Sequence, residues 1–293
     1  MNAADPEFDV CVIGSSNLDL VATTARLPRP GETVLGDSYA EHAGGKGLNQ
    51  AVAAARSGAR TAFVSAVGAD PAGDQLLAVM AAESIATRHV RRHADIVTGR
   101  ALIGVAHGGE NSIIVVPGAN ATVTGHDIPT ARVVLAQLEV PLGAIIAAFR
   151  SAADRGAITV LNPAPARELP AELLRLCDIV VPNELEAEVL GGVAQLTEFG
   201  ATSVLVTLGS DGAMLHDASG VTPIDPYAVS SIDTTAAGDT FCGALCARLA
   251  AGDRLIDAAR FASAAAAFST TRSGAVPSIP TAAEVDRFLQ GDG

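Results

Sequence analysis

An aspartate that follows a run of small residues is the feature with the clearest chemical meaning in this sequence. Residues 233–241 read Asp-Thr-Thr-Ala-Ala-Gly-Asp-Thr-Phe, and an apolar stretch with Phe241 and Leu245 on one helical face follows at once. The segment therefore predicts a tight turn that opens a helix. The first N–H groups of a helix have no partner inside it and the helix dipole adds positive charge, so such a turn attracts an anion.

Asp239 needs a separate reason to stand at an anion site, because its carboxylate repels a resting phosphate. A general base that takes the proton of a hydroxyl attacking a phosphoryl group is such a reason. Ala236, Ala237 and Gly238 keep bulky side chains away and offer main-chain amides. The alternative interpretation is that Asp239 is only a favourable acid in a first helical turn, since short glycine motifs often match by chance.

The composition excludes several classes of protein. Of the 293 residues, 49% are hydrophobic and 17% are charged, which supports a large buried core. The formal net charge of −13 argues against nucleic acid as a partner, because a nucleic-acid backbone requires a basic face. No apolar run reaches the length of a membrane span, and residues 1–8 lack the pattern of a secretory signal. We expect a cytoplasmic protein with four buried, reduced thiols: Cys11, Cys177, Cys242 and Cys246.

Polar residues follow the first predicted strand, residues 8–13. Asn17 and Asp19 are two residues apart, so their side chains would point the same way from an extended segment. An amide and a carboxylate placed together can bind the adjacent hydroxyls of a sugar. The alternative is a turn in which both side chains bond to local backbone.

A small exposed sheet is predicted beside the first strand. Residues 20–42 suit extended structure, and residues 98–106 and 112–116 read as two strands joined by a hairpin-like link. Between these parts, residues 43–50 form a glycine-rich entry to a helix that Gly58 ends. This loop lacks the spacing of a Walker phosphate loop, so Lys46 is not expected to act as its lysine.

Strands and helices alternate through the rest of the chain. We expect a strand at 61–67, a turn at 68–74 and a helix at 75–84, with His89 and His93 on the surface. From residue 131 the alternation is typical of a parallel sheet with helices on both faces. Polar residues at successive strand ends then gather along one edge of the sheet, where a cleft is expected. These ends are at 138–139, 161–163, 181–183 and 207–209.

Four motifs in this order are similar to those of the PfkB family of ribokinase-like carbohydrate kinases. They are residues 43–49, 137–139, 162–167 and 236–239. The resemblance covers nearly the whole chain and implies an α/β fold, a three-layer αβα sandwich with a central, mostly parallel sheet and a small inserted β-sheet lid. It implies one kinase domain over 1–293, with the lid formed by about 16–43 and 96–118, and a homodimer that pairs through the lid.

The resemblance also implies an activity, the ATP-dependent phosphorylation of the 5-hydroxyl of D-ribose. Asp239 would be the catalytic base, and the amides of Ala236, Ala237 and Gly238 would form the anion hole. The residues implied to hold the sugar are Asn17, Asp19, Gly45, Lys46, Asn49, Glu139 and Asp239. Magnesium would be ordered by an Asn-x-x-Glu motif, and the nucleotide set is Asn183, Glu186, Thr207, Gly209, Ser210, Gly212, Gly238 and Ser263. A monovalent cation, K⁺, would be held mostly by carbonyl oxygens of Asp233, Thr235, Ser269, Arg272, Gly274 and Ser278.

Two stretches depart from the family pattern, and other functions stay open. Residues 120–137 and 192–200 are shorter than the pattern, and the second leaves too little room for a full helix. A kinase of the same family that acts on deoxyribose, fructose or a nucleoside is one alternative. A purine usually stacks on an aromatic side chain, and the predicted lid offers only Tyr39 for this. A nucleoside is therefore a less favoured substrate. A non-catalytic sensor of a sugar or a nucleotide is the other alternative, and the presence of Asp239, Asn183 and Glu186 together speaks against it.

Overall fold

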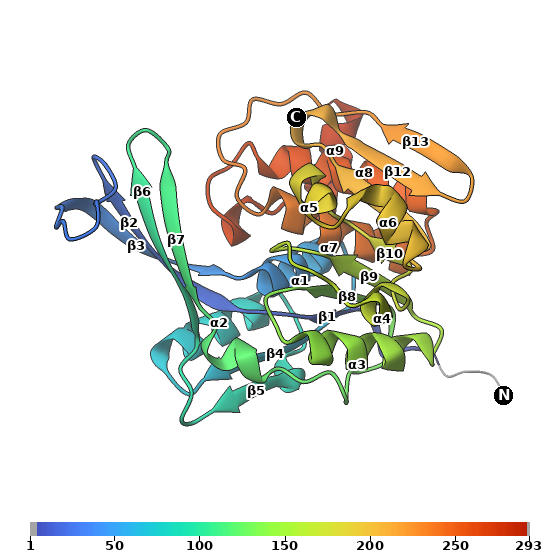
Figure 1. Cartoon of the computed structure of the whole chain (residues 1–293), viewed down its shortest axis with the longest axis horizontal. Coiled ribbons are helices and arrows are strands. Elements are labelled where there is room, and N and C mark those ends of the chain that lie inside the picture. Colours follow the sequence, from blue (N-terminus) through green and yellow to red (C-terminus); the bar gives the residue numbers. More distant parts are fainter. Residues whose placement is uncertain (1–4, 292–293) are drawn as a thin grey trace.

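Alternate side chains of the first strand, β1 (Phe8–Ile13), enter two different apolar layers. Val10 and Val12 pack into one buried cluster, whereas Cys11 and Ile13 pack into the other. This division follows from strand geometry, because successive side chains point to opposite faces of a sheet. The computed structural model describes residues 5–291, and in it β1 runs through the middle of a sheet that is covered on both faces (Figure 1).

The central sheet has nine strands in the order β13-β12-β11-β10-β9-β8-β1-β4-β5. Only β12 and β13 are antiparallel to their neighbours. The strand order reverses between β1 and β8, and ligands of open α/β sheets bind beyond the carboxyl ends of the strands at such a point. The bounds are β4 (Thr61–Gly68), β5 (Val90–His93), β8 (Ala131–Gln137), β9 (Ile158–Asn162), β10 (Ile179–Val180), β11 (Ser203–Thr207), β12 (Ala213–Asp217) and β13 (Gly220–Ile224).

Helices cover both faces of this sheet, which confirms the predicted three layers. One apolar cluster joins the sheet to α1 (Lys46–Arg56), α2 (Pro71–Ala82), α7 (Ala237–Ala250), α8 (Leu255–Ser269) and α9 (Ala282–Gln290). The other joins it to α3 (Leu142–Ala153), α4 (Ala171–Leu174), α5 (Glu184–Val189) and α6 (Gly192–Glu198). Short 3₁₀ turns lie at Thr87–His89, Gly118–Thr122, Gly209–Asp211 and Val276–Ser278.

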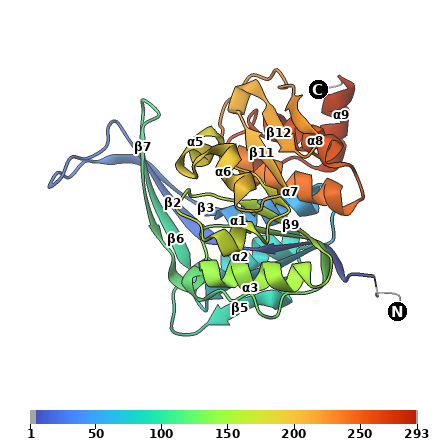
Figure 2. The same cartoon turned by 45° about the vertical axis from the view of Figure 1, so that its right-hand side comes forward.

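A second sheet of four strands stands apart from the main one (Figures 1 and 2). Its order is β3-β2-β6-β7, with β2 and β6 parallel. The bounds are β2 (Asn17–Thr24), β3 (Gly36–Gly44), β6 (Gly99–Ala106) and β7 (Asn111–Val116). The predicted small sheet is therefore confirmed, although residues 25–35 of the stretch predicted to be extended belong to neither β2 nor β3.

Two local predictions are wrong. The helix expected at 75–84 begins at Pro71, because Asp70 caps it by accepting from the Gly73 N–H at 2.8 Å. The short stretch 192–200 does hold a helix, α6, of seven residues. His89 and His93, which were predicted to lie on the surface, are partly exposed.

The four cysteines are buried and unpaired, as predicted. Across residues 5–291, no helix is both long and apolar enough to cross a membrane. Residues 1–4, part of the segment predicted to lack a secretory signal, lie outside the described residues.

Candidate active site

The turn before α7 has the conformation that an anion site requires. Ala236 stands at the helix start with φ 60°, a left-handed backbone, and no side chain caps the helix. The Ala237 N–H donates to the Thr234 carbonyl at 3.2 Å. Because the first N–H groups of a helix lack intrahelical acceptors, those of Gly238 and Asp239 are the donors that this turn offers to a ligand.

Asp239 is buried at the start of α7, with 6% of its surface exposed, and two side-chain amides hold its carboxylate. Asn49 Nδ2 donates to Oδ2 at 3.0 Å, and Gln50 Nε2 donates to Oδ1 at 2.8 Å. Both donors come from α1, which packs directly on α7. The glycine loop and the aspartate turn, 190 residues apart in the sequence, therefore form one site.

Lys46 brings the positive charge of this site. The Asp239 carboxylate raises the pKa of Lys46, burial lowers it, and Glu139 and Glu186 raise it further. Its main-chain N–H donates to Glu139 Oε2 at 3.0 Å, and the Ser15 hydroxyl donates to the same oxygen. Glu139 thus connects the loops after β1 and β8, where the strand order reverses.

Asp19 lies beside the glycine loop in a poorly solvated position. Burial and the nearby Glu139 carboxylate raise the pKa of Asp19 to about 7. A Cβ atom on Gly44 would lie only 2.1 Å from Asp19 Oδ2, so a side chain cannot stand at position 44 without moving the carboxylate. Gly45 adopts φ +91°, and a Cβ there would lie 2.9 Å from the Asn17 N atom.

Asn17 is buried and bonded to a residue that the sequence did not single out. Its Oδ1 accepts from Asn120 Nδ2 at 2.7 Å, and Asn120 Oδ1 accepts from the Ser16 N–H at 2.9 Å. The alternative in which Asn17 bonds only to local backbone is therefore wrong. Asn120 fixes the oxygen of Asn17 and leaves its NH₂ group as the part that can meet a ligand.

A cavity of about 220 Å³ lies in front of Asp239. It gathers predicted residues from four separate segments of the chain: Lys46, Asn183, Glu186, Thr207, Ala236, Ala237, Gly238 and Asp239. Asn162, Ala164, Val181, Thr234 and Cys242 complete its lining. Catalytic and nucleotide-binding predictions thus meet at one place, with Lys46 and Asp239 of the predicted sugar-binding set. The other predicted sugar-binding residues lie outside the lining: Asn17, Asp19, Gly45, Asn49 and Glu139.

Asn183 and Glu186 form a capping box at the start of α5. Asn183 Oδ1 accepts from the Glu186 N–H at 2.8 Å, and Glu186 Oε2 accepts from the Asn183 N–H at 2.9 Å. Burial raises the pKa of Glu186, which the Asn183 N–H and Lys46 partly offset and Asp239 reinforces. The pair caps a helix and also presents oxygen atoms to the cavity, whereas Glu184 and Glu188 are exposed.

The remaining nucleotide residues lie outside the lining of this cavity. Gly209 and Ser210 are exposed in the turn after β11, and Gly212 is buried, with Ile224 O 2.2 Å from a Cβ placed there. Ser263 lies in α8, a helix that packs against α7. Thr207 is the member of the predicted loop that reaches the cavity.

The residues predicted to hold a monovalent cation make two kinds of contact, one through the Asp233 carboxylate and one through the hydroxyls of Ser269 and Ser278. Asp233 accepts from the Thr235 N–H at 2.9 Å and from the Gly274 N–H at 2.8 Å. Burial raises the pKa of Asp233, but these hydrogen bonds outweigh it and the net shift is downward. Ser269 and Ser278 donate their hydroxyls to the carbonyls of Ala266 and Ala275, both at 2.8 Å.

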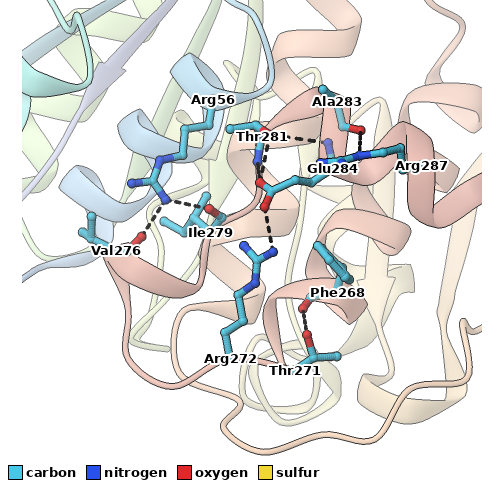
Figure 3. Close-up of polar contacts among 10 residues, drawn as sticks. All are labelled: Arg56, Phe268, Thr271, Arg272, Val276, Ile279, Thr281, Ala283, Glu284 and Arg287. Carbon is cyan, nitrogen blue, oxygen red and sulfur yellow. Dashed lines mark hydrogen bonds and ion pairs between the residues drawn. The ribbon is translucent and has the colours of Figure 1, made fainter. Parts of the chain in front are cut away.

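The Arg272 side chain does not face Asp233. It pairs with Glu284 at 2.7 Å, and its guanidinium lies 4.7 Å from the centre of the Phe268 ring (Figure 3). Arg56 anchors the same loop by donating to the carbonyls of Val276 and Ile279, at 2.8 and 2.6 Å (Figure 3). Arg272 could thus serve a cation only through its main chain.

Besides Asn120, three residues of the site were missed in the sequence: Gln50, Gln137 and Asn162. Gln50 contacts Asp239, Gln137 Nε2 donates to Gln50 Oε1 at 2.6 Å, and Gln50 Nε2 donates to Asn162 Oδ1 at 3.0 Å. Each stands within or beside a recognised motif, but a polar residue at a strand end is more often structural. The signal that could have found them is that all three are amides. Gln137 and Asn162 end two strands, and Gln50 directly follows the glycine motif.

Comparison with known proteins places this geometry in a family. The model of the pfkB family carbohydrate kinases matches residues 7–282. The ribokinase of Staphylococcus aureus is 42% identical over 299 residues, which cover 95% of this chain and 98% of that protein. The ribokinase of Haemophilus influenzae is 41% identical over 298 residues, with 95% and 97% coverage.

Solved structures agree with this assignment. A ribokinase from Thermotoga maritima superposes with a TM-score of 0.89 at 34% identity, covering 97% of this chain and 99% of that one. An Arabidopsis thaliana ribokinase complexed with ribose and ATP superposes with a TM-score of 0.90 at 32% identity and the same coverage. The predicted family and fold are confirmed: the chain belongs to the PfkB family of carbohydrate kinases.

Proposed function

We propose that this chain transfers the γ-phosphoryl group of ATP to the 5-hydroxyl of D-ribose and releases D-ribose 5-phosphate and ADP. The observation that carries the proposal is the buried Asp239 carboxylate, which stands at the start of α7 and is bonded to Asn49 of the glycine loop. The similarity to ribokinases at about 40% identity, and to one solved with ribose and ATP, supports this substrate pair.

The sugar lies between the glycine loop and the second sheet. It is held by residues in and around the loop after β3: Asn17, Asp19, Gly45, Lys46, Asn49 and Glu139. Asn49 Oδ1 is a buried acceptor with no partner among residues 5–291. A buried acceptor without a hydrogen bond is costly, so a sugar hydroxyl that donates to it gains binding energy.

Asp239 removes the proton of the 5-hydroxyl as its oxygen attacks the γ-phosphorus. The new O–P bond forms while the bond from the γ-phosphorus to the β-γ bridging oxygen breaks, and ADP leaves. The N–H groups of Gly238 and Asp239 and the ammonium of Lys46 stabilise the charge on the transferring group. Closure of the second sheet, residues 16–43 and 96–118 of a single domain, excludes water that could otherwise take the phosphoryl group.

Magnesium accompanies the nucleotide in this proposal. Within the described residues, no group of three His, Cys, Asp or Glu side chains could hold a metal ion by itself. A magnesium ion keeps several waters and uses few carboxylates, so Glu186 and Asn183 with the phosphates of ATP suit it. When bound, the ion neutralises phosphate charge. The nucleotide further meets Thr207, Gly209, Ser210, Gly212, Gly238 and Ser263.

A monovalent cation, K⁺, lies beside the anion hole. Both carboxylate oxygens of Asp233 and the hydroxyls of Ser269 and Ser278 are already engaged, so main-chain carbonyls of the predicted set would supply most ligands. The negative charge of Asp233 makes this loop a favourable place for a cation.

The chain forms a homodimer through its second sheet and works in the cytoplasm. Strand β7 is an edge strand whose six residues are all exposed, among them Ile113, Ile114 and Val115. An exposed apolar edge strand favours pairing with another chain. Four unpaired cysteines suit a reducing compartment.

An ADP-release assay with four acceptors tests the substrate. Ribose is expected to give the highest kcat/KM, above deoxyribose, fructose and adenosine. Deoxyribose is the informative competitor, because the deoxyribokinase of Salmonella typhi is also 32% identical over 96% of this chain. Faster turnover of deoxyribose, fructose or adenosine would reject ribose as the substrate. Absence of ADP release with all four acceptors would reject the kinase activity itself.

A further inference from the structure

Four amide side chains and one carboxylate form a continuous hydrogen-bonded network under the active-site cavity. Asp239 accepts from Asn49 and Gln50, Gln50 also donates to Asn162, and Gln137 donates to Gln50. The network crosses α1, α7 and the ends of β8 and β9. Gln50 and Gln137 are fully buried, and neither lines the cavity.

At each end of the network lies a group that can only accept a hydrogen bond, the Val181 carbonyl and the Asp239 carboxylate. These two groups determine which amide atoms between them donate and which accept. Asn162 Nδ2 donates to the Val181 carbonyl at 2.9 Å, so the oxygen of Asn162 must face Gln50. Gln50 therefore turns its NH₂ group toward both Asn162 Oδ1 and Asp239 Oδ1. With the amide reversed, the Gln50 oxygen would face two acceptors at hydrogen-bond distance, which costs free energy in a buried site.

The third contact of Gln50 supports the same orientation. Gln137 Nε2 donates to Gln50 Oε1 at 2.6 Å, so every polar atom of the Gln50 amide has a partner of the correct kind. Asn49 holds the second oxygen of the base. Because both of its oxygens accept N–H bonds, the carboxylate of Asp239 is held in one orientation.

We propose that Gln50 is a positioning residue for the phosphoryl transfer, which holds the Asp239 carboxylate aimed at the acceptor hydroxyl. Asn162, whose oxygen is turned toward Gln50 by the Val181 carbonyl, imposes the orientation in which Gln50 does so, and Gln137 supports it through the Gln50 oxygen. The inference rests on the proposed role of Asp239 as the base. Gln50 touches neither substrate in this proposal. The charged groups around Gln50 are Lys46 of α1, Glu139 after β8, Glu186 of α5 and Asp239 itself. All four are present in every Gln50 and Gln137 variant, so they affect these enzymes equally.

Replacement of Gln50 by Met keeps the length of the side chain and removes the amide. We expect kcat to fall about 10- to 100-fold, as for a mispositioned general base, while the KM for ribose changes less than threefold. If Gln50 had only a structural role, its replacement would lower the melting temperature without this selective fall in kcat relative to KM. An unchanged kcat in a folded Gln50→Met enzyme overturns the proposal.

Two variants of Gln137 test the orientation without touching Asp239. Gln137→Met removes the donor to Gln50, and Gln137→Glu replaces it by a group that donates only while it is protonated. A buried carboxyl with acceptor neighbours stays protonated to unusually high pH. We therefore expect the kcat of Gln137→Glu divided by that of Gln137→Met to exceed one at pH 6 and to fall roughly tenfold by pH 9, when the ionised group turns the Gln50 amide around.

A ratio that stays constant from pH 6 to pH 9 rejects the imposed orientation, and melting curves recorded at both pH values exclude unfolding as the cause. The Asp239→Asn enzyme separates the two levels of the argument. If it keeps near-normal turnover, the base assignment fails and the positioning role fails with it. If it is inactive while the Gln50 and Gln137 variants behave like the unaltered enzyme, only the positioning role fails.

Discussion

Asn49 Nδ2 lies 3.0 Å from Asp239 Oδ2, so a residue of the glycine loop directly holds the carboxylate at the start of α7. The two motifs were predicted separately, one for sugar and one for phosphoryl chemistry. Their contact means that a sugar bound at Asn49 is bound next to the base. Proximity of this kind is what converts a weak carboxylate base into an effective one.

The first prediction concerns Asp239→Asn. The amide cannot accept a proton from the 5-hydroxyl, so we expect turnover to fall about 10³-fold while ribose binding, measured by calorimetry, stays within a few-fold of normal. Glu184→Gln is the matched control, because Glu184 is an exposed acid in a first helical turn. Near-normal turnover of Asp239→Asn would contradict the role of Asp239 as base.

The second prediction concerns the pH dependence of stability at Asp19. Its folded-state pKa of about 7 is raised from 3.8, so its contribution to stability is full below pH 3.8 and is lost as the pH rises through 7. Asp19→Asn should therefore melt at a higher temperature than the unaltered protein at pH 8, with an advantage that shrinks toward pH 5.

The cost of Asp19→Asn is expected in ribose binding, because the carboxylate proposed to accept from sugar hydroxyls is exchanged for an amide. Thermal melts at pH 5 and pH 8 and a ribose titration measure both effects. Asp286→Asn, an exposed acid on α9, should show neither. An advantage for Asp19→Asn that grows toward pH 5 would mean that burial does not disfavour the charge of Asp19.

The sequence predicted the parts of this enzyme that depend on local pattern. The strand at 8–13, the long sheet and the helix after Gly238 follow from apolar periodicity and turn residues, and all are confirmed. The start of α2 was missed because Asp70 and Pro71 read as a turn, although an acid before a proline is also a helix-start signal.

The amide network could not be predicted from one sequence. Gln50, Gln137 and Asn162 are far apart in the chain, and only the packing of α1 on α7 over the ends of β8 and β9 brings them to Asp239. Asn120 was missed for the same reason, since its contact with Asn17 spans 103 residues. Polar contacts between distant segments leave no local periodicity.

The third prediction concerns Gly44. A methyl group there would lie 2.1 Å from Asp19 Oδ2, so Gly44→Ala forces the carboxylate away and should raise the KM for ribose at least tenfold. Overpacking of this kind also costs about 1–3 kcal/mol of stability. Gly143→Ala is the control, because nothing lies within 4 Å of a Cβ at that exposed helical position. Equal KM values in the two variants would place ribose away from Asp19.

The fourth prediction concerns the monovalent cation. Exchange of K⁺ for tetramethylammonium, which is too large for a carbonyl shell, should lower kcat roughly tenfold in the unaltered enzyme. Asp233→Ala removes the charge and the two hydrogen bonds that shape the loop, so its kcat should be low and should no longer respond to K⁺. Asp253→Ala, outside the loop, should keep the full response. A K⁺ response that persists in Asp233→Ala would locate the cation elsewhere.

The fifth prediction concerns the exposed edge strand β7. Ile114 is 63% exposed there, and a charge in its place would oppose pairing with the second sheet of another copy. We expect light scattering to report a dimer for the unaltered protein and a monomer for Ile114→Asp. Ile232→Asp makes the same change at a residue 70% exposed outside the sheet, and it should remain dimeric. If Ile232→Asp lost the dimer and Ile114→Asp kept it, the interface would lie away from β7. If the unaltered protein were a monomer, the predicted dimer would be refuted.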